Sequence, residues 1–265
     1  MTTLDPLLES ALAGLRVTAP ASLRPAVMVE IGQADRYARI ESPIGPLIVA
    51  WNGLGVSAVE ASVEDALFMA THHARTGRET VLAAAVPDAL ASAIGRRLSG
   101  DRRVRIDLDL RGHTRFERDV WAKALEIPRG EVRPYGWIAA EIGRPRAVRA
   151  VGTALGHNPV PLIVPCHRVV RSDGSIGQYS LGGPANKRTI LAAEGLDPDR
   201  LETGARAGVR YVGSKTTRVV CFPTCHAAKR IKSVHQVPFR SLGQAATAGY
   251  HPCRLCRPGS GSIAA

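Results

Sequence analysis

One cysteine, Cys166, stands between a proline and a histidine in the mostly apolar run 158–170. A thiol reacts as the thiolate, and a neighbouring imidazole is a common means of lowering its pKa from about 8.5. Cys166 and His167 therefore form a candidate pair of nucleophile and base. Adjacent residues of an extended chain point to opposite sides, so the His167 ring can reach Cys166 only around a turn or through a water. A buried structural cysteine is the alternative.

The backbone around this cysteine is expected to be stiff. Three prolines precede it at positions 159, 161 and 165. They exclude a helix, and they remove hydrogen-bond donors from any central strand. We therefore expect residues 162–164 to form only a short extended piece in front of the thiol.

The other four cysteines form two close pairs near the C-terminal end, Cys221 with Cys225 and Cys253 with Cys256. Five cysteines in all, with four of them paired in this way, indicate metal binding rather than a set of disulfides. Four thiolates at this spacing predict one zinc ion and no organic cofactor. The zinc either only folds the segment or activates one of its sulfurs.

The charge of the chain is unevenly distributed. Lys and Arg number 35 against 23 Asp and Glu, and residues 205–265 contain ten Lys or Arg and no acid. Such a segment is a nucleic-acid surface or a solvated basic face, and the rest of the chain favours nucleic acid. No apolar run approaches the ~20 residues of a membrane helix, and residues 1–6 lack the basic start of a signal peptide. We expect a cytoplasmic protein that binds no membrane.

The first 112 residues show patterns of both helix and strand. Leu4, Leu8, Ala11 and Leu15 have helical spacing, which predicts a short packing helix or a loosely held leader. Three strand-like runs separated by turn residues predict an antiparallel meander over 37–40, 47–51 and 56–60. Residues 65–74 and 88–98 read as helices, and apolar alternation predicts a strand over 104–110. Together they predict a small α+β domain.

A helix-turn-helix pattern follows. After a helix with Phe116, Val120, Ala124 and Ile127 on one face, helices are expected over 135–142 and 146–155, joined by a turn at 143–145. In the second of these, Val148, Val151 and Leu155 form the expected core stripe. The outward face is basic and small, so it can approach a DNA groove closely; it consists of Arg146, Arg149, Gly152 and Thr153. The alternative is an ordinary solvated arginine face.

The Pro-Cys-His-Arg-Val segment resembles the active-site signature of the O6-alkylguanine-DNA alkyltransferases, the methylated-DNA–protein-cysteine methyltransferases. Further landmarks of that family follow in order between Phe116 and Leu196: Tyr135, the run 146–152, Asn158 with Pro159, the loop 177–180, and Glu194 with Gly195. The resemblance implies irreversible transfer of an alkyl (methyl) group from O6-alkylguanine in DNA to Cys166, once per molecule. It also implies a supporting domain that resembles ribonuclease H without its catalytic acids, and a winged-helix-like catalytic domain.

The same resemblance assigns roles to individual residues. It implies that Glu194 orients His167, which takes the thiol proton through a water, and that Asn158 stabilises the segment of Cys166. Tyr135 would donate to N3 of the leaving purine. It places the second helix in the minor groove of double-stranded DNA, with Arg149 filling the gap left by a flipped nucleotide. The implied DNA-binding residues are Arg149, Arg146, Tyr135, Gly152 and Thr153, and the implied pocket residues are Tyr179, Ser180 and Val169.

The four-cysteine segment is similar to the metal-binding repair module of the Ada protein. The similarity covers the cysteines and the flanking residues 211–212, 215–217, 248–250 and Pro252. The Ada module precedes the alkyltransferase and moves a methyl group from a DNA phosphotriester to the first of its four cysteines, which corresponds to Cys221. A purely structural zinc site and a second methyl acceptor at Cys221 both remain open.

The predicted organisation has six parts: a leader (1–35), a ribonuclease-H-like supporting domain (36–112), an alkyltransferase domain (113–198), a linker (199–208), a small α/β zinc module (209–258) and a tail (259–265). We expect a monomer on DNA, with cooperative binding left open. Two other functions fit part of the chain. A non-enzymatic sensor of alkyl lesions would lack the reactive cysteine, and a Cys-His hydrolase would leave the basic helix-turn-helix unexplained.

Overall fold

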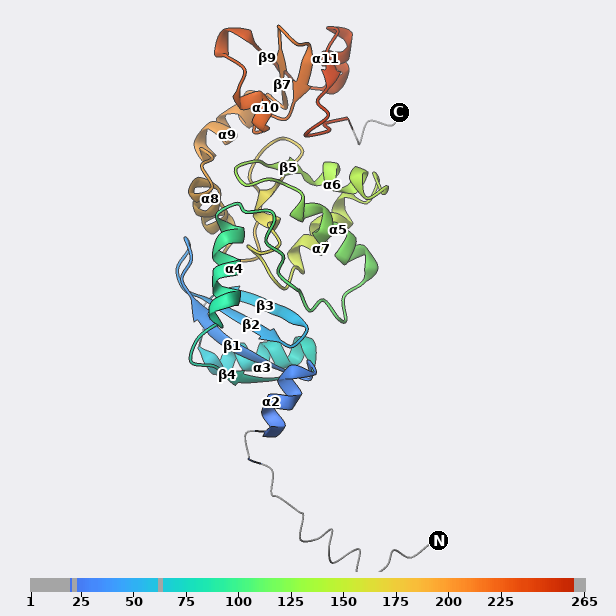
Figure 1. The fold of residues 1–265 in the computed structure, drawn as a ribbon. Helices are drawn as coiled ribbons and strands as arrows, with labels where there is room; N and C mark the ends of the chain where they lie inside the picture. Colours follow the sequence, from blue (N-terminus) through green and yellow to red (C-terminus); the bar gives the residue numbers. More distant parts are fainter. Residues whose placement is uncertain (1–19, 21–22, 62–63, 260–265) are drawn as a thin grey trace, which may run out of the picture.

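The computed structural model describes residues 20, 23–61 and 64–259. The predicted helix between Leu4 and Leu15, most of the leader and most of the tail lie outside these residues. Three parts follow one another along the molecule: a sheet with its helices, a central group of helices, and a small second sheet (Figure 1). The fold is α+β, as predicted, with mixed sheets and helices.

The first part is a four-stranded sheet with the order β3-β2-β1-β4. β1 pairs antiparallel with β2, and β2 with β3, so the predicted meander is confirmed. A fourth strand, which the sequence did not predict, runs parallel to β1. The elements are α2 (Leu23–Glu30), β1 (Ala34–Ile40), β2 (Leu47–Asn52), β3 (Gly55–Ala61), α3 (Asp65–Thr76), β4 (Glu79–Leu82) and α4 (Asp88–Leu98).

Alternation along the strands directs side chains to two cores. Tyr37 and Ile48 pack with Phe68 of α3 on one face of the sheet. Val49 on the other face joins the larger core, to which Ile94 of α4 and the central helices belong. In Figure 1, α3 and α4 accordingly lie on opposite sides of the sheet. The sheet therefore supports the central part directly.

The prediction of a strand over 104–110 is wrong. In this stretch only Leu108 forms a β-bridge, with Val56. The Val56 amide donates to the Asp107 carbonyl, and the Asp109 amide donates to the Val56 carbonyl. Because this stretch meets the edge of the sheet at one residue, its neighbours have no partner strand, and alternation alone does not make a ladder.

The central part contains the predicted helix-turn-helix, α6 and α7. Its first helix, α5, begins with a capping box in which Thr114 and Glu117 satisfy each other's backbone amides. α7 begins two residues later than expected, and Val148 in its first turn is 37% exposed, so the core stripe is Val151, Ala154 and Leu155. The elements are α5 (Arg115–Leu125), β5 (Arg133–Pro134), α6 (Tyr135–Glu141), α7 (Val148–Gly156), the 3-10 helix η1 (Cys166–Arg168), β6 (Val169–Val170) and α8 (Gly183–Ala193).

The extended piece expected at 162–164 is instead a tight turn. Pro161 and Val164 bridge each other, and the Val164 amide donates to the Val160 carbonyl at 3.0 Å. Leu162 has a φ of 73°, which is uncommon for a residue other than glycine, and its side chain is buried. Burial of the leucine holds the turn that carries the chain toward Cys166.

The third part is a second four-stranded sheet with the order β10-β8-β7-β9. The predicted linker 199–208 is mostly the helix α9, which leads from α8 to this sheet (Figure 1). Its Asp197 cap and Pro198 at the first position are a common start of a helix. The elements are α9 (Pro198–Arg206), β7 (Tyr211–Ser214), β8 (Val219–Cys221), α10 (His226–Lys229), η2 (Ser233–His235), β9 (Gln236–Phe239), α11 (Leu242–Thr247) and β10 (His251–Pro252).

Candidate active site and metal centre

Asn158 fixes the position of the candidate nucleophile. Its Nδ2 donates to the Val164 carbonyl at 3.1 Å and to Sγ of Cys166 at 3.2 Å, while its Oδ1 accepts from the Val160 amide. Cys166 is the first residue of η1 and is 5% exposed. The first sheet contributes as well, since the Val59 amide of β3 donates to the Pro159 carbonyl at 2.8 Å.

His167 and Glu194 form a buried pair behind the thiol. The distance from His167 Nε2 to Glu194 Oε1 is 2.9 Å. Arg168 binds the same carboxylate through Nε at 3.0 Å and Nη2 at 2.6 Å. The other ring nitrogen, Nδ1 of His167, is buried without a hydrogen-bond partner in the described part of the chain. It is thus the nitrogen available to accept a proton.

Burial and hydrogen bonding set the charges of this site. Burial opposes ionisation of Glu194, but hydrogen bonds from His167 and Arg168 outweigh it and lower its pKa to about 2. Burial lowers the pKa of His167 despite the carboxylate beside it. Burial also raises the pKa of the Cys166 thiol, against the Asn158 hydrogen bond and the charge of Lys187. The free site therefore holds a neutral thiol, a neutral imidazole and a carboxylate.

Lys187 is a buried cation that sequence reasoning missed. Its side chain is fully buried, and its Nζ donates to the carbonyls of Val169 at 2.6 Å and Gln178 at 3.3 Å. Burial lowers its pKa to about 8. The signal was present, because Lys187 lies three and four residues before Ile190 and Leu191 on the buried face of α8. Arg168, which holds Glu194, was missed too.

A cavity of about 260 Å³ opens beside the thiol. Its lining consists of Tyr135, Gly152, Leu155, Gly156, Cys166, Gln178, Tyr179 and Ser180. Tyr135 and the predicted pocket residues Tyr179 and Ser180 therefore line this cavity. Val169, also predicted for the pocket, is not among the lining residues, and its side chain is fully buried.

α7 borders this cavity and also faces solvent. Gly152 lies at the cavity, where an added Cβ would be 4.0 Å from the Tyr135 ring. Arg146, Arg149 and Thr153 are exposed, as expected of a surface that contacts a ligand. α7 and the turn before it thus join a surface with two exposed arginines to the reactive thiol.

The four remaining cysteines meet in one buried cluster. Their Sγ atoms lie within 4.8 Å of one another. Cys221 ends β8, Cys225 caps α10, and Cys253 and Cys256 follow β10. Four buried thiols at this separation fit one tetrahedral Zn²⁺, which would keep them as thiolates and join the three segments.

Comparisons with known proteins agree with both sites. A family model described as "6-O-methylguanine DNA methyltransferase, DNA binding domain" matches residues 115–196, and one described as "Metal binding domain of Ada" matches residues 203–259. The methylated-DNA–protein-cysteine methyltransferase of Mycobacterium tuberculosis (strain CDC 1551 / Oshkosh) is 41% identical over 158 residues, 60% of this chain and 91% of the relative. That of Salmonella typhimurium is 36% identical over 162 residues, 59% of this chain and 94% of the relative.

A solved structure is similar as well. The crystal structure of Mycobacterium tuberculosis OGT in complex with DNA has 38% sequence identity and a TM-score of 0.48, covering 60% of this chain and 93% of that one. In the described part of this chain, no helix has the length and apolar character needed to cross a membrane. On the identity and coverage of its relatives, this chain belongs to the methylated-DNA–protein-cysteine methyltransferase family.

Proposed function

We propose that this chain is a DNA repair enzyme that transfers the alkyl group of O6-alkylguanine to its own Cys166. The activity is that of a methylated-DNA–[protein]-cysteine S-methyltransferase. The observation that carries the proposal is the buried Cys166–His167–Glu194 arrangement, which opens into a cavity bordered by α7, beside the exposed Arg146 and Arg149. A sensor of alkyl lesions would not need this relay.

The target nucleotide must leave the duplex. O6 of guanine lies inside the base stack, whereas the Cys166 thiol is 5% exposed at the cavity. Flipping the nucleotide costs a few kcal/mol, and less for a damaged, weakly paired base. α7 enters the minor groove, where Arg146, Arg149 and Thr153 face the DNA and Arg149 occupies the vacated place in the stack.

Transfer is a displacement at the alkyl carbon. Nδ1 of His167 takes the thiol proton through a water, and Glu194 keeps the imidazole oriented through Nε2. The sulfur attacks the alkyl carbon while the bond from that carbon to O6 breaks and its electrons pass to guanine. The Tyr135 hydroxyl donates to N3 and the Ser180 amide to O6, so the charge of the leaving purine is stabilised at both ends.

The reaction ends with the alkylated cysteine. A thioether is a poor leaving group, and the zinc-module cysteines, none of which lines the cavity, are the only other thiols in the sequence. Each molecule therefore reacts once.

We also assign a role to each part of the chain. We assign residues 36–112 to a ribonuclease-H-like support, 113–198 to a winged-helix-like catalytic domain and 209–258 to a zinc module of the Ada type. The protein works as a monomer in the cytoplasm.

The zinc module adds a basic surface for DNA. Its nine Lys and Arg residues, with no Asp or Glu among them, favour salt-dependent, non-specific binding. Zinc held by Cys221, Cys225, Cys253 and Cys256 would supply structural cross-linking. Since Cys221 is 1% exposed, we assign it the structural role rather than that of a second methyl acceptor.

One labelling experiment tests the function. Purified protein is incubated with duplex DNA that carries one radiolabelled O6-methylguanine, and the label is located by peptide mass spectrometry. We expect at most one label per molecule, on Cys166, and none in a Cys166→Ser variant that still binds the duplex. Tight binding of the lesion by wild-type protein without any label would favour the sensor instead.

A further inference from the structure

The backbone segment 130–133 lies between the zinc module and the active site. On the active-site side, the Gly130 amide donates to Oε2 of Glu194 at 3.2 Å. This is the carboxylate that binds His167 and Arg168 through its other contacts. A shift of Gly130 would therefore remove one of the donors that fix Glu194.

The same segment also reaches the strand after the nucleophile. β5 pairs in parallel with β6, with Arg133 opposite Val169 and Pro134 opposite Val170. β6 directly follows η1, which carries Cys166. Both ends of the relay, the carboxylate and the thiol, thus depend on where 130–134 lies.

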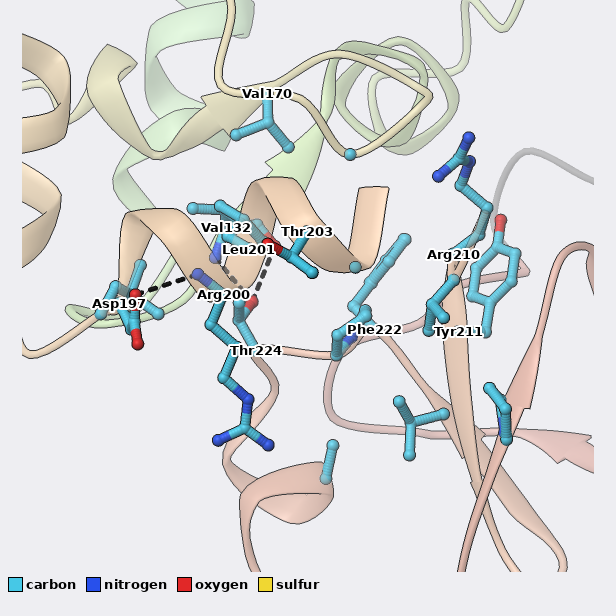
Figure 2. Close-up of a pocket in the computed structure, with 18 of the residues that line it drawn as sticks. Val132, Val170, Asp197, Arg200, Leu201, Thr203, Arg210, Tyr211, Phe222 and Thr224 are labelled. Carbon is cyan, nitrogen blue, oxygen red and sulfur yellow. Dashed lines mark hydrogen bonds between the residues drawn. The ribbon is translucent and has the colours of Figure 1, made fainter. Parts of the chain in front are cut away.

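The zinc module holds the opposite side of this segment. Lys229 Nζ donates to the Gly130 carbonyl at 2.8 Å, and the His226 amide donates to Oε1 of Glu131 at 2.8 Å. The Thr224 hydroxyl accepts from the Val132 amide at 2.9 Å and donates to the Val132 carbonyl at 3.3 Å. Figure 2 shows this pair of bonds between Thr224 and Val132.

A buried ion pair completes the contact. Glu131 and Arg133 pair with each other and are 6% and 3% exposed. The Arg133 guanidinium lies 5.3 Å from the ring of Phe222, in the zinc module, and 5.7 Å from the ring of Trp137, in α6. Buried charges are retained only where they are well paired, so this geometry requires the module to stay in place.

The hydrogen bonds to segment 130–133 lie beside a cavity at the junction of the central part and the zinc module. A cavity of about 720 Å³ adjoins Val132 and Thr224, between α9, the turn at 171–174 and the zinc module (Figure 2). Side chains do not fill this space, and the hydrogen bonds of Lys229, His226 and Thr224 fix the segment beside it, in addition to the apolar packing of the module in the shared core. Arg257 makes further contacts with the central part, pairing with Glu126 and Glu141 and lying 5.9 Å from the Trp137 ring.

We propose that the zinc module positions the alkyl-transfer site, with Lys229 and Thr224 as positioning residues that act on Glu194 through Gly130 and Val132. The inference rests on the proposed transfer to Cys166. It gives the module a second role besides DNA binding, since the catalytic relay is complete only while the module is docked.

The test compares single-turnover rates of Lys229→Met, Lys229→Arg and wild type between pH 5 and 9. Free O6-benzylguanine serves as the substrate, so that a lost DNA contact cannot change the rate. We expect Lys229→Met to react about three- to tenfold more slowly at neutral pH, because the hydrogen bond from Gly130 to Glu194 is weakened, whereas its complete loss would cost more than about tenfold. The midpoint of its pH profile should rise, because less of the thiol ionises. Lys229→Arg should restore both the rate and the midpoint of the pH profile, since a guanidinium can donate to the Gly130 carbonyl.

Matched controls separate this effect from loss of charge or of fold. Lys232→Met removes the same charge from an exposed site of the module that, in the described chain, has no hydrogen bond to 130–133, and it should behave as wild type. Zinc content and melting temperature are measured for every variant. If Lys229→Met loses its zinc, Thr224→Val is used instead, because it keeps the side-chain shape.

The outcomes are distinguishable. A wild-type rate and pH profile for a zinc-loaded Lys229→Met or Thr224→Val variant would overturn the inference. Failure of the wild-type protein to transfer any alkyl group would instead refute the proposed function.

Discussion

Nε2 of His167 lies 2.9 Å from Oε1 of Glu194, and Arg168 binds the same carboxylate. Glu194 is therefore shared between a neutral base and a permanent cation. Its pKa of about 2 keeps it ionised throughout the physiological range. The pH dependence of transfer should then come from Cys166 and His167, and Glu194 should contribute a constant charge and orientation.

Glu194→Gln should slow transfer to Cys166 by about 10²-fold at neutral pH, the lower end of what a positioned base contributes. The amide has the same shape but no charge. It therefore binds the imidazole less well and leaves His167 a weaker base. Single-turnover rates on methylated duplex across pH measure the effect.

Glu202→Gln is the matched control for this change. Glu202 pairs with Arg188 on the exposed side of α8 and α9, away from the relay, so the variant should keep the wild-type rate. Melting temperatures must be compared, because Glu194→Gln also removes a partner of the buried Arg168. A folded Glu194→Gln variant with an unchanged rate would exclude the relay.

Lys187 should make stability depend on pH. Its pKa falls from 10.5 in the unfolded chain to about 8 in the folded one, because burial disfavours the charged form. Below pH 8 both states carry the proton and folding bears the full cost of burying the charge. Between pH 8 and 10.5 the folded state binds fewer protons than the unfolded state, so the free energy of unfolding rises with pH, by about 3 kcal/mol in total.

Urea unfolding of wild type and Lys187→Met at several pH values checks this prediction. Methionine has a similar length and no charge, so the difference between the two free energies of unfolding should grow in favour of wild type from pH 8 upward. The exposed Lys232→Met variant should show no such trend. A constant difference between wild type and Lys187→Met would mean that Lys187 is not buried as a cation.

The sequence predicted what local pattern and motif determine, and missed what depends on tertiary contacts. The helix-turn-helix and the meander follow from periodicity, and the signature around Cys166 located the reactive segment. Arg168 and Lys187 read as ordinary basic residues until η1 and α8 bring them to Glu194 and Val169. The turn at Leu162 was missed because a positive φ at a leucine is held only by surrounding packing.

Arg149→Ala should slow repair in duplex DNA but not the reaction with a free base. Arg149 is exposed on α7, which borders the reactive cavity, so it is placed to support a flipped nucleotide rather than the chemistry. We expect the rate on duplex O6-methylguanine to fall by about tenfold or more, since unstacking costs a few kcal/mol. The rate with free O6-benzylguanine should stay at the wild-type value.

Arg206→Ala serves as its control, because Arg206 is an exposed arginine at the end of α9 whose Nη2 donates to Thr203. Its loss removes the same charge without touching α7. An equal loss on duplex and free base for Arg149→Ala would place Arg149 in the chemistry instead.

Cys221 should remain unmethylated when the full chain meets DNA that carries a methyl phosphotriester. Its thiol is 1% exposed, and the next residue, Phe222, packs against Arg133 of the catalytic part, so a backbone phosphate cannot approach the sulfur. Peptide mass spectrometry after incubation with labelled duplex measures methylation. The same samples should contain one zinc per chain, because four thiols within 4.8 Å need a cation to be held as thiolates.

Cys256→Ser provides the complementary measurement. Cys256 is fully buried in the cluster, and its sulfur accepts from the Phe222 amide at 3.4 Å, so its loss should release zinc and loosen the contact with 130–133. If the site is structural, this variant loses zinc and reacts more slowly at Cys166, while Cys221 is unlabelled in both proteins. Label on Cys221 of the zinc-loaded wild type would show instead that the module opens on DNA and repairs phosphotriesters.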